Sequence, residues 1–147
     1  MVEIMVVVVM IGIMAAIVVP QFSGVSDDAK SGAVQGALAG VRSGIASFRS
    51  KAILSGTSPF PTLVQLNTTG TVLQATMPTN PYNKLANVQT VTLAQANART
   101  VVNATTFAWN YYIDNASSPP VAIFYCNSIT PTTVSNGSGG FMNANQL

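Results

Sequence analysis

Hydrophobic residues dominate the first third of the chain in two successive patterns. Residues 4–19 carry no polar side chain, and as an α-helix this run would extend about 24 Å. Over residues 22–53 apolar positions recur every three or four residues, the spacing of one face of a helix. No proline interrupts residues 21–58. The pattern predicts one long helix over residues 1–54, far longer than the usual globular helix of about 11–12 residues.

Two residues weaken the apolar part of this helix. Pro20 removes a main-chain hydrogen bond and its ring clashes with the preceding turn, at a cost of about 3 kcal/mol. Gly12, eight residues earlier, is also a poor helix former. We therefore expect the helix to kink or melt locally between Gly12 and Pro20.

Glycine recurs at every fourth position in the amphipathic part of the helix, at Gly32, Gly36, Gly40 and Gly44. Each glycine costs about 1 kcal/mol relative to alanine in a helix interior. Together they form one ridge without side chains, which permits the close approach of another backbone. We expect close packing along this ridge. The alternative is a chance spacing in a segment rich in Gly, Ala and Ser.

Residues 55–147 are rich in Thr, Asn and Ser and are broken up by Gly and Pro, which predicts a small head. The capping-box pattern Thr62-x-x-Gln65 predicts one short helix. Alternation of apolar and polar positions over residues 107–113 predicts a half-buried strand, and the apolar residues 121–126 predict a second. The intervening residues 114–120 predict a hairpin connection.

A third strand is predicted from residues 88–93 or from residues 99–102, and the sequence leaves both alternatives open. Residues 127–147, with their Pro, Gly, Asn and Ser, predict a loop. A small antiparallel sheet packed on the apolar stripe of the helix makes this an α+β fold. Its two parts are the helix at 1–54, whose residues 1–22 form the apolar segment, and the head at 55–147.

Charged residues are scarce, and their scarcity excludes several classes of function. The chain has six Lys+Arg, four Asp+Glu, no His and one Cys, so 7% of its residues are charged, against about 25% in soluble domains. These counts exclude a His-based triad, His-ligated zinc and an intrachain disulfide. They also disfavour a nucleic-acid groove. We therefore expect no enzyme, cofactor, metal or specific nucleic-acid partner, but a structural, membrane-associated or surface-exposed protein.

The apolar run is close to the length that a membrane-spanning helix needs, which is roughly 20 residues. A cleaved secretory leader is the alternative interpretation. No Lys or Arg precedes the run, and the residues VVPQF at its end are a poor cleavage site. We therefore predict a retained membrane segment over residues 1–22.

The segment VEIMVVVVMIGIMAAIVVPQF resembles the N-terminal helix of the type IV pilin superfamily, which includes the pseudopilins of type II secretion systems. The matching features are the lone Glu3 entering an apolar run, Gly12 within it and Pro20 eight residues later. The head resembles that of major pseudopilins and related pilins in its Met-Pro-Thr-Asn-Pro-Tyr segment and its two aromatic strands. The long helix with a small sheet also matches the ladle shape of pilins.

The resemblance implies a subunit of a helical filament. Such a subunit is stored in the inner membrane and extruded by a pilus or type II secretion assembly machinery, with the helices forming the filament core. It implies that Glu3 pairs with the N-terminal amine of a neighbouring copy, and that the segment from Gly12 to Pro20 loses helicity on assembly. In the family an aromatic residue begins the mature chain four positions before this glutamate. Only Met1 and Val2 precede Glu3 here, so we expect a leader and two further mature residues upstream.

We therefore expect a major structural subunit of a type IV pilus-like extracellular filament that polymerises with itself. The major pseudopilin of a type II secretion system is the closest alternative. A minor, tip-located binding subunit is a further alternative, but it would need larger loops or a ligand pocket. The charged residues of the second half of the helix are expected to form a solvated face, some of them between subunits.

Smaller features add three expectations about the head. Cys126 ends an apolar strand and is expected to be a buried thiol. Major pseudopilins often bind calcium in the C-terminal loop, but residues 127–147 contain no carboxylate, so we expect no calcium site. The candidate glycan acceptors are the asparagines of four Asn-x-Ser/Thr motifs, Asn67, Asn103, Asn115 and Asn136.

Overall fold

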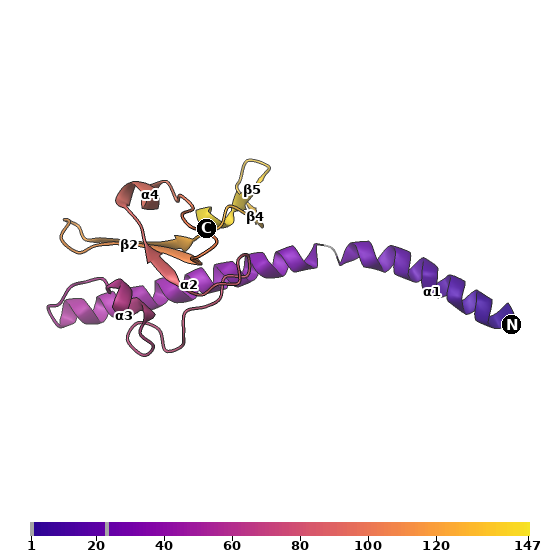
Figure 1. The fold of residues 1–147 in the computed structure, drawn as a ribbon, viewed down its shortest axis with the longest axis horizontal. Coiled ribbons are helices and arrows are strands. Elements are labelled where there is room, and N and C mark those ends of the chain that lie inside the picture. The colour runs from indigo at the N-terminus through magenta and orange to yellow at the C-terminus, as the bar shows by residue number, and fades with distance from the viewer. Residues whose placement is uncertain (1, 23) are drawn as a thin grey trace.

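The chain forms a helical rod with a small α+β head on its C-terminal half, as the sequence predicts. The computed structural model describes residues 2–22 and 24–147. The rod consists of helix α1 (Val2–Gln21) and helix α2 (Val25–Leu54), which follow one another end to end. The head lies along α2, and α1 projects away from it (Figure 1). This ladle-shaped arrangement matches the pilin-like architecture that was expected.

The interruption of the rod lies later than the expected weak stretch between Gly12 and Pro20. Helix α1 continues through both residues and ends at Gln21. The N–H of Phe22 then donates to the Val19 carbonyl over 3.2 Å, and Gly24 caps the start of α2. Pro20 lies one residue before the end of α1, so its ring disturbs only the last turn and leaves the preceding turns helical.

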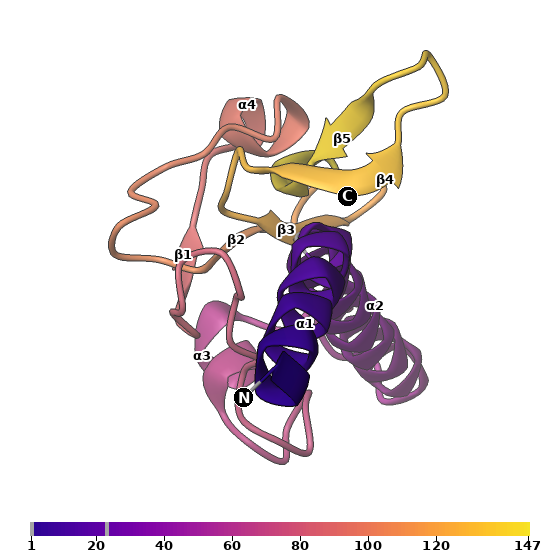
Figure 2. The same ribbon diagram turned by 90° about the vertical axis from the view of Figure 1, so that its right-hand side faces the viewer.

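One face of α2 forms the centre of the hydrophobic core. The buried apolar side chains of α2 begin at Val34 and continue through Leu38, Val41 and Ile45. The same stripe nearer α1 is exposed, as at Val25. Viewed along the rod, the head elements gather on one side of α2 and leave its other side uncovered (Figure 2). The amphipathic stripe was therefore predicted correctly, but only its second half packs against the head.

A three-stranded sheet covers the buried face of α2. Its strands are β1 (Val88–Thr90), β2 (Trp109–Asp114) and β3 (Val121–Cys126), in the order β1-β2-β3. The predicted hairpin is confirmed, since β2 and β3 pair antiparallel with Trp109 opposite Cys126. The stacked rings of Trp109 and Phe124, with centroids 5.6 Å apart, belong to the core against α2.

The sheet is mixed rather than purely antiparallel, which corrects the prediction. Of the two alternatives for a third strand, residues 88–93 contain β1, whereas residues 99–102 form no strand. Strand β1 runs parallel to β2. The chain between them includes helix α4 (Leu93–Asn97), and this connection brings the chain back so that β2 starts at the same end as β1.

The C-terminal segment is ordered rather than a loop, which is a second correction. It contains β4 (Pro131–Ser135), β5 (Phe141–Asn143) and a short 3₁₀ turn, η1 (Ala144–Gln146). Strands β4 and β5 pair antiparallel. The Asn136 carboxamide oxygen closes the turn between them by accepting the N–H groups of Ser138 and Gly140, at 2.8 and 3.1 Å.

The predicted short helix is present as α3 (Leu63–Asn67). The Thr62 hydroxyl accepts the Gln65 N–H, while the Gln65 side chain accepts the Thr62 N–H. Both bonds of the capping box are therefore formed, and Leu66 of this helix is buried in the core.

Candidate assembly surface

Helix α1 presents a continuous apolar surface that is not covered by the head. Every residue from Val2 to Pro20 is exposed. Its apolar window has a mean hydropathy of 2.9 and none of that window is buried. By length and composition this is the helix, among the residues that the structure describes, that could cross a membrane. Exposing this much apolar surface to water is unfavourable, by about 1.5–3 kcal/mol for each large side chain.

Glu3 lies in the first turn of α1, where a carboxylate interacts favourably with the helix dipole. It is the acidic residue of this helix and stands at the end of the apolar surface. Within residues 2–22 and 24–147 the structure gives Glu3 no ion-pair partner. The other two residues singled out for assembly lie on the same helix, Gly12 about 14 Å and Pro20 about 26 Å further along the axis.

The four glycines of the ridge have two different environments. A methyl group added at Gly32, Gly36 or Gly40 would meet no described atom within 4 Å. At Gly44 it would lie 2.8 Å from Leu73 Cδ2 and 3.1 Å from the Val72 carbonyl oxygen. Close approach within the chain therefore explains Gly44 alone. The other three glycines leave an open strip on α2.

This open strip borders a shallow groove between α2 and the segment that follows α3. The groove has a volume of about 400 Å³. Gly36 and Gly40 lie on its helical side, and residues 73–76 with Pro78 form the opposite side. The ridge is thus accessible from outside the chain along most of its length.

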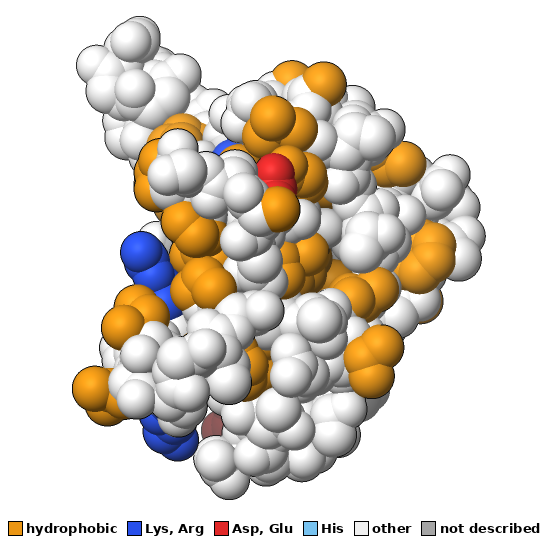
Figure 3. All heavy atoms as spheres, turned by 90° about the vertical axis from the view of Figure 1, so that its left-hand side faces the viewer, with side chains coloured by type: hydrophobic (Ala, Val, Ile, Leu, Met, Phe, Trp, Pro, Cys, Tyr) orange, Lys and Arg blue, Asp and Glu red, His pale blue; other side chains and the backbone are white. Residues whose placement is uncertain are grey.

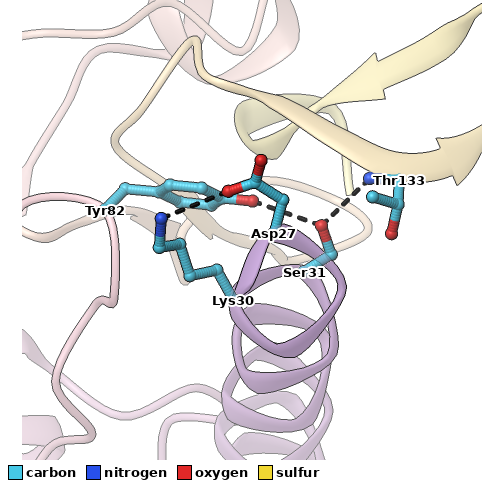
Figure 4. Close-up of polar contacts among 5 residues, drawn as sticks. All are labelled: Asp27, Lys30, Ser31, Tyr82 and Thr133. Carbon is cyan, nitrogen blue, oxygen red and sulfur yellow. Dashed lines mark hydrogen bonds and ion pairs between the residues drawn. The ribbon is translucent and has the colours of Figure 1, made fainter. Parts of the chain in front are cut away.

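A buried serine fixes the first turns of α2 to two distant parts of the head. The Ser31 hydroxyl accepts the Thr133 N–H at 2.9 Å and lies 3.4 Å from the Tyr82 hydroxyl (Figure 4). Ser31 is only 1% exposed. Nearby, Lys30 and Asp27 form an exposed ion pair of 3.2 Å. The sequence analysis missed Ser31, although its position three residues before Val34 places it on the buried face.

The four candidate glycan acceptors also differ in their surroundings. Asn67, Asn103 and Asn136 are exposed. Asn115 is half-buried, and its carboxamide accepts the Phe60 N–H at 3.0 Å and donates to the Phe60 carbonyl at 2.9 Å. A glycan on the Asn115 nitrogen would replace a donor hydrogen that this residue uses to hold the chain after α2.

Cys126 is a buried thiol, as the sequence predicts. Asn80 donates to its sulfur at 3.3 Å. Burial raises the pKa of Cys126 to about 12, which keeps the thiol protonated and unreactive at neutral pH.

No protein-family model, curated protein or solved structure matches this chain. The fold consists of a long N-terminal helix, apolar and exposed at its start, that enters a small α+β head, an arrangement compatible with a pilin-like fold.

Proposed function

We propose that this protein is the structural subunit of an extracellular helical filament of the type IV pilus kind, assembled through α1. The observation that carries the proposal is the exposed apolar surface from Val2 to Pro20. A helix of this kind is stable in a bilayer, or in a bundle with the same helix of other copies. The proposed subunit uses both environments in turn, first the inner membrane and then the filament core.

An ion pair at Glu3 would fix the register in which neighbouring helices pack in the bundle. A carboxylate inside a membrane costs about 2.5–3.5 kcal/mol at the helix centre and less near its ends. In an apolar bundle, breaking a buried pair is strongly unfavourable, so a cationic partner from a neighbouring copy would fix the position of Glu3. We infer that this partner is the neighbour's N-terminal amine, as the resemblance to pilins implies.

The arrangement of the head supports the same proposal. Because the head gathers on one side of α2 (Figure 2), the uncovered side is free to face other helices. Gly32, Gly36 and Gly40 form an exposed strip of α2, which borders the groove beside residues 73–76 and would permit close contacts with another helix. The Thr-, Ser- and Asn-rich head would then form the outer wall of the filament.

Electron microscopy of the fraction sheared from cells, with mass spectrometry to identify its protein, tests the proposal. Long filaments that contain this chain are the expected result. A chain that stays in the inner membrane, without filaments, would contradict a major pilin. The secretion pseudopilus has the same architecture, so short filaments confined to the cell envelope would identify that alternative instead.

A further inference from the structure

Three of the six basic residues line one pocket on the head. Arg42 and Arg49 reach it from α2, and Arg99 reaches it from the end of α4. The pocket has a volume of about 370 Å³, which lies within the range of small-molecule sites, about 300–1,000 Å³. Its remaining lining is apolar: Ile45, Ala46, Phe60, Ala122, Ile123 and Phe124.

These arginines form no ion pair with an Asp or Glu side chain in the part of the chain that the structure describes. The exposed ion pair there joins Lys30 to Asp27. The Asp114 carboxylate accepts main-chain N–H groups instead, from Ala116 and Ser117. At the end of the molecule opposite α1, Lys and Arg side chains lie along one edge and acidic side chains are sparse (Figure 3). The pocket therefore carries three positive charges that no Asp or Glu side chain in the described chain neutralises, and two of them face an oxygen of Leu147, the last residue.

Two of the three guanidinium groups are brought together by one oxygen of Leu147, the last residue of the chain. Arg42 Nη2 donates to the Leu147 oxygen at 2.8 Å, and Arg99 Nη1 approaches that oxygen at 3.4 Å. Arg42 also donates twice to the Phe124 carbonyl, at 3.2 and 3.0 Å. Burial and the nearby charge of Arg99 lower the pKa of Arg42, although arginine stays protonated in proteins. The two cations are thus held close to each other in spite of their repulsion.

Arg49 completes the group from two turns further along α2. Its guanidinium lies 5.0 Å from the centre of the Phe60 ring, a cation–π contact. Among the described residues the guanidinium N–H groups of Arg49 have no hydrogen-bond acceptor. Arg49 therefore offers a full set of donors at the edge of the pocket.

The backbone of Arg99 supplies an independent observation. Helix α4 ends with the Arg99 N–H bonded to the Ala96 carbonyl and the Thr100 N–H bonded to the Gln95 carbonyl. Arg99 occupies the left-handed position of this ending, with φ 52°, where glycine is usual because it has no Cβ. An arginine is strained there, and its guanidinium is held over the Tyr125 ring, 5.7 Å from the ring centre.

We infer that this pocket binds a small organic phosphate, with its oxygens between the three guanidinium groups and its apolar part against Phe124 and Ile123. Guanidinium groups match phosphate oxygens in pairs of parallel hydrogen bonds. Three guanidinium groups therefore suit a phosphate dianion better than they suit a carboxylate, which carries a single charge. A membrane headgroup fits less well, since Arg42 lies about 30 Å along the helix axis from Phe22. This inference does not depend on filament assembly.

Isothermal titration calorimetry of the full chain, unassembled in non-ionic detergent micelles, tests the inference. Phenyl phosphate is the probe, with inorganic phosphate and phenol as its two separate halves. We expect one site per chain and at least tenfold tighter binding of phenyl phosphate than of either half. Raising the salt concentration should weaken the binding, because the attraction is electrostatic.

Two variants address the pocket without removing the main-chain bonds of Arg42. Arg49→Gln and Arg99→Gly should each weaken phenyl phosphate binding at least tenfold. Arg99→Gly is expected to fold, since glycine suits the left-handed backbone at this position. Lys51→Gln is the matched control, because it removes one charge from the same helix outside the pocket and should change the affinity less than twofold.

Several results would overturn the inference. These are the absence of saturable binding, an equal loss in Lys51→Gln, and equal affinity for inorganic phosphate and phenyl phosphate. Tighter binding of dihexanoyl phosphatidylglycerol than of phenyl phosphate would assign the pocket to a lipid headgroup instead.

Discussion

The Ser31 hydroxyl of α2 accepts the main-chain N–H of Thr133 at 2.9 Å, across 102 positions of sequence. This bond joins the helix to β4 at the edge of the hydrophobic core. Ser31 is buried and also lies against the Tyr82 hydroxyl, so one small side chain connects three separate segments of the fold (Figure 4).

Ser31→Ala should therefore lower the free energy of unfolding by about 1–3 kcal/mol, because it leaves the Thr133 N–H without its acceptor. The measurement is urea unfolding of the full chain in detergent micelles, followed by the fluorescence of the buried Trp109. Ser47→Ala is the control, since Ser47 is exposed on the same helix. Equal stability of the two variants would show that the bond contributes little.

Local sequence patterns predicted the helices and strands that are determined by residues close together in the sequence. The alternation over residues 107–113 identified β2, and the capping box at Thr62 identified α3. Thr92 and Gln95 form the same capping box at the start of α4. The sequence therefore carried a signal for α4 as well, which the sequence analysis missed. The direction of β1 had no such signal, because it depends on how the connection to β2 folds back.

The remaining features arise from contacts between distant residues. Strand β4 is rich in Thr and pairs with β5 through a turn built by Asn136, so it shows no clear apolar alternation. The spacing of Arg42 and Arg49 places them on one side of a helix, but only the fold brings Arg99 to them. The close contact of Gly44 with Leu73 likewise depends on a loop whose path the sequence does not indicate.

A substitution on the glycine ridge should change the stability of the subunit and the assembly of filaments in opposite directions. Gly40→Ala should stabilise the isolated subunit by about 1 kcal/mol, because alanine is the better helix former and the added methyl group meets nothing. The same change should reduce the yield of sheared filaments if neighbouring helices approach this face closely.

Gly44→Ala is the matched variant on the same ridge. Its methyl group would crowd the Val72 carbonyl oxygen and Leu73, so we expect it to gain none of this stability. Urea unfolding and filament yield are measured for both variants. Normal filament yield in Gly40→Ala would remove the ridge from the assembly surface and leave Gly44 as an internal packing contact.

Burial of Cys126 predicts a loss of stability in alkaline solution. Its pKa is raised to about 12 in the folded protein, whereas an unfolded cysteine titrates near 8.5. Between these values the unfolded chain loses a proton that the folded chain keeps, so the free energy of unfolding falls as pH rises. The slope for one such group approaches about 1.4 kcal/mol per pH unit.

Urea midpoints between pH 7 and pH 10 measure this dependence. Below about pH 8 this thiol should make no pH-dependent contribution to the free energy of unfolding, since it is protonated in both the folded and the unfolded state. Cys126→Ala should be less stable at pH 7 because it leaves a cavity, yet show a smaller fall between pH 8.5 and pH 10. An unchanged fall in this variant would assign the alkaline loss to other groups, such as Tyr111, whose pKa burial also raises.

Glu3 gives the most direct test of how the subunits assemble. Glu3→Ala should leave the amount of protein in the inner membrane normal, because removing a carboxylate makes insertion of α1 no less favourable. It should sharply reduce filaments, because the neighbour's ammonium would then lack its partner in an apolar core. Glu3→Gln keeps the size and removes only the charge, so it should share the defect. Membrane fractionation and electron microscopy of sheared filaments give the two readouts, and normal filaments in both variants would remove Glu3 from the assembly mechanism.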